Sequence, residues 1–272
     1  MKSMIPLVQA IATVLLFFGC AERRVEVYHA ASHECAKEED QWVFENDTVM
    51  LRYSFWSSGG SMSFVIYNKA TKPIFINWKN SALILNDQKM HYWSDAVKFS
   101  GSSSGVSATK TTSVTDFDWA WVTRSRSESA MATVTSGAMV KDEMITSLPP
   151  KSYIGFRRYQ LLKDIVDVDG PNTDARLVSA PGKPGRTETI RMMRYNENSS
   201  PARYRNFLQL SFEEDMRTVF YIDNAFWLSE VEDMSNGVFL GDVIAIESDR
   251  TRVYEKAYRR RSSFYRRYTI SR

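Results

Sequence analysis

Cysteine and histidine are scarce in this chain, with two and three copies among 272 residues. Two cysteines cannot build a disulfide framework, so the fold must be held together by its hydrophobic core. His29 and His33 are four residues apart and would face one metal ion on a helix, but no third ligand follows at a recognised spacing. We therefore expect neither a metal site nor a cofactor.

The chain also lacks a strong excess of charge and an apolar run long enough to cross a membrane. The apolar run near its start covers 15 positions, from Met4 to Phe18, whereas a membrane-spanning helix needs about 20 residues. Without residues 1–20 the chain has 34 cations and 32 anions, a net charge of +2. This near neutrality excludes a protein that is coated as a whole by charge of one sign.

The first 20 residues have the layout of a secretory signal, with the cation Lys2, the apolar run and a small residue at its end. The final pair, Gly19-Cys20, resembles a bacterial lipobox, in which the cysteine is lipidated and becomes the mature amino terminus. We expect residues 1–19 to be a signal peptide and Cys20 to be the site of lipidation. The alternative is an ordinary signal peptide with an incidental cysteine.

Alternating apolar and polar residues predict many short strands. The apolar members of the stretch 49–55 recur at every second position, as in a half-buried strand. A turn at 57–61 and a strand at 62–67 complete a predicted hairpin. Further strands are predicted at 74–78, 82–85, 153–162, 207–212, 218–222 and 225–231. Such a series without intervening helices predicts a mostly β fold, an antiparallel β-sandwich of Ig-like architecture.

The remaining segments complete the expected organisation. Residues 20–47 are interpreted as the lipidated cysteine with a tether, residues 48–249 as the sandwich domain, and residues 250–272 as a basic C-terminal segment. Within the domain, a Ser/Thr-rich stretch at 100–116 and an Asp/Pro-rich stretch at 163–186 indicate long loops. Asp249 could cap a short C-terminal helix, and a strand that ends in a disordered basic tail is the alternative.

A family resemblance adds to this interpretation. The segment Tyr67–Ser81 has a strand, an Asn-containing turn, a proline, a second strand and then Trp-Lys-x-Ser; together with segments 44–49 and 148–154 it resembles uncharacterised lipoproteins of Bacteroidetes-type bacteria. The resemblance covers about half of the mature chain in patches. It implies an envelope β-sandwich lipoprotein and no particular activity. The mixed charges after Cys20 favour the periplasmic face of the outer membrane over the cell surface.

One string in the sequence matches a catalytic motif, but its surroundings do not fit that motif. Gly101-Ser102-Ser103-Ser104-Gly105 matches the G-x-S-x-G string of a nucleophile elbow, but no helix is predicted after it and every histidine precedes it. We therefore expect no catalytic residues of this kind and interpret the string as part of a loop.

Two groups of residues are candidates for binding. Trp119 and Trp121 would share one face of a strand and could stack on a sugar or a partner protein. Residues 250–272 hold nine cations and one anion, a net charge of +8. The arginines of this end that alternate with aromatic residues are Arg259, Arg260, Arg261, Arg266 and Arg267. They suit phosphate groups on lipid head groups or lipopolysaccharide; nucleic acid is not expected, because an exported protein rarely meets it.

These features predict a non-enzymatic binding or assembly module, tethered to the outer membrane by its lipid and contacting an envelope protein or glycan. The alternative is a periplasmic hydrolase that acts on envelope glycan with paired carboxylates, which leave little trace in a sequence. A third hypothesis is a structural lipoprotein whose basic end holds membrane phosphate.

Overall fold

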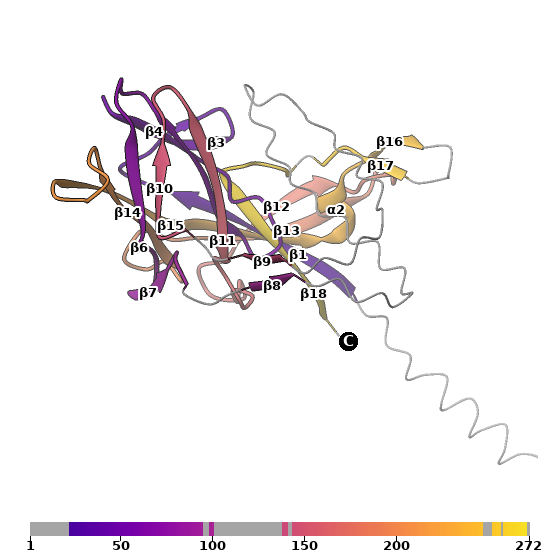
Figure 1. Ribbon diagram of the computed structural model, residues 1–272. Coiled ribbons are helices and arrows are strands. Elements are labelled where there is room, and N and C mark those ends of the chain that lie inside the picture. The colour runs from indigo at the N-terminus through magenta and orange to yellow at the C-terminus, as the bar shows by residue number, and fades with distance from the viewer. Residues whose placement is uncertain are drawn as a thin grey trace, which may run out of the picture. The chain divides into compact units, whose positions relative to one another are not determined.

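A computed structural model describes residues 22–94, 98–100, 138–140, 143–246, 252–256 and 258–270 (Figure 1). Antiparallel strands dominate these ranges, and α2 (Asn236–Leu240) is their only α-helix. The predicted mostly β class is confirmed. No helix in the described ranges has the length and apolar character needed to cross a membrane.

The chain divides into two compact units, Met1–Trp93 with Met144–Arg272, and Ser94–Glu143. In the described part of the smaller unit, β8 (Lys98–Ser100) pairs with β9 (Ala138–Val140). The predicted loop at 100–116, with its G-x-S-x-G string, falls almost wholly outside the described residues.

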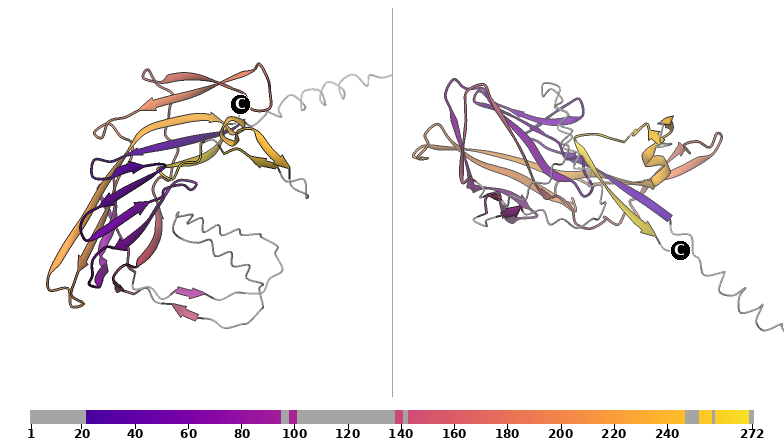
Figure 2. Two further views of the ribbon diagram at one scale, coloured as in Figure 1. Left: turned by 90° about the horizontal axis from the view of Figure 1, so that it is seen from above. Right: turned by 45° about the vertical axis from the view of Figure 1, so that its right-hand side comes forward.

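Most described strands of the larger unit belong to two antiparallel sheets (Figure 2). The nine-stranded sheet has the central order β10-β6-β14-β15-β1-β18, with β7 beside β6 and with β13, then β12, beside β15. Its strands are β1 (Glu22–Ala31), β6 (Ile74–Leu85), β7 (Gln88–His91), β10 (Ile145–Leu148), β12 (Asp174–Ser179), β13 (Thr187–Arg194), β14 (Arg203–Ser211), β15 (Val219–Ser235) and β18 (Ser263–Ile270).

The second sheet has five strands in the order β11-β5-β4-β3-β2. They are β2 (Ala36–Glu38), β3 (Gln41–Glu45), β4 (Val49–Tyr53), β5 (Ser61–Asn68) and β11 (Tyr153–Gln160). A separate two-stranded ribbon pairs β16 (Val243–Ile246) with β17 (Arg252–Tyr254). The predicted hairpin over 49–67 is confirmed as the β4–β5 pair. Alternate residues of β4 are buried, as its period of two predicts, whereas β5 is buried continuously from Met62 to Ile66.

Both sheets contribute to one aromatic core. The ring of Tyr53, from β4, lies 4.9 Å from that of Phe226, from β15, and 5.9 Å from that of Phe64, from β5. The Tyr53 hydroxyl donates to Asn224 Oδ1 at 2.7 Å and accepts from Asn206 Nδ2 at 2.9 Å. Because these polar groups are buried, their hydrogen bonds fix how side chains of the two sheets meet.

Two of the segments behind the family resemblance meet at Asn68, at the end of β5. The buried Asn68 side chain donates to the backbone carbonyls of Lys72, Leu148 and Pro149 at 2.9, 3.0 and 3.2 Å. Its Oδ1 accepts from the amide of Ala70 at 2.9 Å. This one amide therefore holds the turn after β5 against the turn before β11.

The Trp-Lys-x-Ser part of the resemblance is a bulge in β6. Phe207 faces Ala82 across the sheet while Gln209 faces Asn77, so residues 78–81 oppose a single residue of β14. The Ser81 hydroxyl donates to the Asn77 carbonyl at 2.6 Å and accepts from the Gln209 amide at 3.0 Å, which closes the bulge. The strands predicted at 74–78 and 82–85 are thus one bulged strand.

The prediction of a tether over residues 20–47 is wrong for the described part of that range. β1 starts at Glu22 and pairs with β15 on one side and β18 on the other, and β2 and β3 join the second sheet. Four consecutive residues of β1, from Val25 to Tyr28, are buried. Its charged residues are typical of a solvated segment, but in the structure they face or pair with residues of β15 and β18, near the other end of the sequence.

The predicted C-terminal helix is also wrong, because the described part of 250–272 contains β17 and β18. β18 pairs with β1 along its whole length. It is also held by the Ser57–Gly60 turn, where the Gly59 amide donates to the Tyr265 carbonyl at 2.7 Å. The long loop predicted at 163–186 is interrupted by β12, which pairs with β13.

The role of Asn68 gives a first prediction. Asn68→Ala removes the donor of three backbone carbonyls, that of Leu148 in a buried hydrogen bond and those of Lys72 and Pro149 in partly buried ones, so we expect the free energy of unfolding to fall by about 2–3 kcal/mol. Urea denaturation followed by tryptophan fluorescence measures it. Asn80→Ala is the matched control, because that exposed amide makes its bond to Gln209 at the surface. Equal losses in the two variants would contradict the assignment.

Candidate functional site

A row of charged side chains crosses four neighbouring strands of the nine-stranded sheet. Arg191 of β13 faces Asp233 of β15, Asp233 faces Glu26 of β1, and Glu26 faces Arg266 of β18. Residues opposite each other in antiparallel strands project to the same face. The row therefore places two acidic residues side by side, with one arginine at each end.

Asp233 is the most enclosed member of the row, with no exposed surface. Arg24 Nη2 lies 2.7 Å from its Oδ2, and Arg191 Nε donates to the same oxygen at 3.0 Å. The Tyr268 hydroxyl donates to Oδ1 at 2.8 Å. Two guanidinium groups and a phenol thus compensate a carboxylate that would otherwise be costly to bury.

Glu26 is 1% exposed and lacks such strong pairing. The Tyr28 hydroxyl and the Val166 amide, the latter at 3.1 Å, donate to its Oε2. Burial raises the pKa of Glu26 to about 7, against the opposing effect of these two hydrogen bonds, and the negative charge of Asp233 adds to the rise. Near neutral pH this carboxyl is therefore partly protonated.

Two adjacent carboxyl groups in different environments are the arrangement of an acid–base pair in a hydrolase. Here, however, both carboxyl groups are shut off from solvent, at 1% and 0% exposure. No substrate can reach them in this conformation, so the geometry supports a bracing role between strands.

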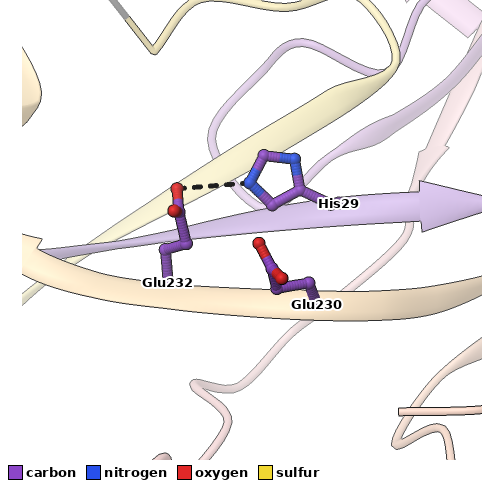
Figure 3. Close-up of side chains that lie close together, drawn as sticks. All are labelled: His29, Glu230 and Glu232. Carbon is purple, nitrogen blue, oxygen red and sulfur yellow. Dashed lines mark hydrogen bonds and ion pairs between the residues drawn. The ribbon is translucent and has the colours of Figure 1, made fainter. Parts of the chain in front are cut away.

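A second cluster lies on the opposite face of β1 and β15 (Figure 3). His29 Nε2 is 3.3 Å from Glu232 Oε2, and one ligand atom from each of His29, Glu230 and Glu232 lies within 4.8 Å of the others. Burial acts to raise the pKa of Glu232, but the hydrogen bond and charge of His29, with the nearby arginines, hold it below its ordinary value. The cluster has the composition of a site for a divalent cation.

The cluster's carboxylates already have cationic partners. Arg176 Nη2 lies 2.8 Å from Glu232, and Arg194 Nε lies 2.7 Å from Glu230. On the other side of the ring, Ser263 Oγ is 3.1 Å from His29 Nδ1. A metal ion would have to compete with two guanidinium groups, and Ser263, at 1% exposure, is closed to a substrate as a nucleophile. The network is therefore satisfied without a ligand.

The pair His29 and His33, considered from the sequence, is not brought together. His29 lies within β1, whereas His33 follows that strand and stands 3.5 Å from Glu197. Sequence reasoning missed Glu230 and Glu232 because they are about 200 residues away. The signal available in the sequence was the spacing of the two glutamates: residues two apart on a strand project to the same face.

An open cavity lies where β1 begins and β18 ends. Its volume is about 360 Å³, and it is lined by residues of β1, β18 and α2. They are Arg23, Arg24, Asn236, Leu240, Arg267, Tyr268 and Thr269. The described lining holds three arginines and no carboxylate, so its chemistry is that of an anion site.

Strand register and ring stacking position the cavity's cations. Arg23 faces Thr269, and the next pair on the same face is Val25 with Arg267, which makes Arg23 and Arg267 diagonal neighbours. The Arg267 guanidinium lies 5.4 Å from the ring centre of Tyr265 and 5.5 Å from that of Phe239. These cation–π contacts orient it before any ligand arrives.

The basic residues predicted from the sequence do not form one patch. Arg266 and Arg267 project to opposite faces of β18: Arg266 donates to the Leu162 carbonyl at 3.2 Å, and Arg267 lines the cavity. Arg261 Nη1 stands 3.9 Å from Asp40. Arg259 and Arg260 lie in the turn before β18.

The other predicted site residues, Cys20, Trp119 and Trp121, lie outside the described residues. Arg23 and Arg24, which also line the cavity, were not among the residues predicted from the sequence, because only the pairing of β1 with β18 brings them beside Arg267.

No family model matches the chain, and no curated protein or solved structure is similar enough to count as a match. The resemblance to Bacteroidetes-type lipoproteins therefore stays a prediction.

The bracing role of Asp233 can be tested by substitution. Asp233→Asn leaves two guanidinium groups poorly paired, so we expect the free energy of unfolding to fall by about 3–5 kcal/mol. Asp223→Asn is the matched control: its pair with Arg205 is partly exposed, and such pairs contribute about 1 kcal/mol or less. A small loss at Asp233, measured by the same denaturation curve, would exclude the brace.

Glu26 gives a prediction for pH. Its pKa is raised from 4.5 to about 7 by folding, so its contribution is complete below pH 4.5 and is lost as the pH rises to about 7 and beyond. Glu26→Gln keeps an acceptor but does not ionise. We expect the stability of this variant, relative to the wild type, to rise by up to about 3 kcal/mol between pH 4.5 and 8.

Thermal unfolding across that pH range measures the effect. Glu214→Gln, at the exposed turn between β14 and β15, is expected to show no such relative change. A wild type and a Glu26→Gln variant with parallel pH profiles would contradict the assignment.

Proposed function

We propose that the protein is a non-enzymatic binding or assembly module of the bacterial cell envelope. In this proposal residues 1–19 direct export and Cys20 carries the lipid. The domain is then held at the outer membrane, on its periplasmic face. The observation that carries the proposal is the arginine-lined cavity, because Arg23 and Arg24 follow the proposed anchor by only three and four residues.

The short stretch of chain between Cys20 and β1 limits how far the domain can lie from the proposed anchor. An extended chain spans at most about 3.6 Å per residue, so the start of β1 at Glu22 lies within about 7 Å along the chain of a lipid attached to Cys20. A long tether would have let the domain move freely, whereas this arrangement keeps one defined end of the sheet at the membrane surface. The cavity is at that end.

The burial of the paired carboxylates supports a binding role over the alternative, a periplasmic hydrolase acting on envelope glycan. Glu26 and Asp233 are enclosed, and the open cavity is lined by arginines instead. Binding of an anionic group needs fixed donors and cations, which this cavity offers, and no acid–base pair.

We also propose that the two main sheets pack as a β-sandwich. Support comes from the shared core, in which Tyr53 and Phe64 of one sheet pack with Tyr204 and Phe226 of the other. The Ig-like architecture stays a prediction. Such a scaffold leaves loops and sheet edges for an envelope protein or glycan partner.

The lipid anchor is tested by mass spectrometry of the mature amino-terminal peptide from an envelope-expressing bacterial host. We expect that peptide to begin at Cys20 and to carry the added mass of acyl chains in the wild type. With Cys20→Ser the acyl mass should be lost and the protein should leave the outer-membrane fraction.

Cys35→Ser is the matched control for this experiment. Cys35 is buried, and burial raises the pKa of its thiol to about 12, so it should carry no lipid and its replacement should leave lipidation unchanged. An unmodified Cys20 in the wild type would refute the anchor.

A further inference from the structure

We infer that the cavity at the start of β1 binds the phosphate group of an anionic lipid head group, in the membrane to which the chain is anchored. The inference rests on the proposed function and names the ligand of that site.

The charges at the cavity select an anion. Arg24 is already compensated, because Asp233 and Glu22 accept hydrogen bonds from its guanidinium at 2.7 and 2.9 Å. Arg23 and Arg267 supply the charge that is left for a ligand. Among the described residues no carboxylate lines the cavity to oppose them, and Thr269 and Asn236 add neutral donors.

The geometry suits a tetrahedral group with several oxygens. Arg23 and Arg267 approach from two adjacent strands, as diagonal neighbours on one face. Each guanidinium can give two parallel hydrogen bonds to a phosphate, which a lysine cannot do. The rings of Tyr265 and Phe239 hold Arg267 in place, so less side-chain freedom is lost on binding.

An exposed aliphatic strand favours a lipid over free phosphate as the source. β16 follows α2 after only two residues, and Val243, Ile244 and Ile246 are 44%, 65% and 67% exposed. Figures 1 and 2 show the ribbon of β16 and β17 beside α2, and the Lys256 amide, just after β17, donates to the carbonyl of Leu240 in the cavity wall at 3.1 Å. Exposed aliphatic side chains on a ribbon that is hydrogen-bonded to the cavity wall match the boundary between head groups and acyl chains.

The test uses residues 20–272 with Cys20→Ser, which keep every residue that the structure describes and carry no lipid. Binding is measured by co-sedimentation with two kinds of vesicle, pure phosphatidylcholine and phosphatidylcholine with about one third phosphatidylglycerol. We expect at least about tenfold tighter binding to the anionic vesicles, and a weaker preference at high salt.

Three variants refine the test. Arg23→Gln with Arg267→Gln should reduce binding to the anionic vesicles at least about tenfold. Arg203→Gln with Arg217→Gln is the matched control, with the same change of charge on exposed residues that do not line the cavity, and should bind nearly as the wild type does. Ile244→Ser with Ile246→Ser should weaken binding to both kinds of vesicle.

Several outcomes overturn the inference. They are equal binding to the two vesicle types, an equal effect of the two arginine pairs, and binding of inorganic phosphate in calorimetry without binding to anionic vesicles. The last result would assign the cavity to a soluble phosphate. Because the protein carries no lipid here, failure of this test leaves the mass-spectrometric result on Cys20 intact, and the reverse is also true.

Discussion

The buried carboxylate of Asp233 is the interaction on which the end of the larger sheet depends. It joins Arg24 of β1, Arg191 of β13 and Tyr268 of β18 to its own strand, β15. Removing such a charge from water is costly, and only complete pairing offsets the cost. These contacts hold four strands in one arrangement. They also position Arg24 and Tyr268, which line the cavity.

The sequence predicted the parts of the fold that local patterns determine. The β4–β5 hairpin and the β14–β15 hairpin both show alternating apolar residues on each side of a turn, and both are present. β1 and β18 could not be recognised in this way. Their arginine and glutamate residues are typical of solvated segments, and the partners that make them strands of the sheet lie up to 248 positions away in the sequence, as Glu22 and Ile270 do.

The same reason limits prediction of the site. The basic composition of residues 250–272 singled out both Arg266 and Arg267, but composition does not say which way a side chain points: Arg267 lines the cavity, and Arg266 projects to the other face of β18. Only the register between β1 and β18 places Arg23 beside Arg267 in the cavity. Sites that are built across long-range strand pairs leave no motif, since each strand contributes only one or two of the residues.

The position of β1 has a consequence for how the protein is made. β1 is the first described strand to be synthesised, yet its two neighbours, β15 and β18, are among the last. Its hydrogen-bonding edges stay open until the chain is nearly complete, because contacts so distant in sequence form slowly. Until they pair, this strand is exposed to wrong pairing for longer than the other described strands. A chaperone that binds the amino-terminal region until β18 has been synthesised would therefore improve the folding of this chain more than that of a sheet built from neighbouring hairpins.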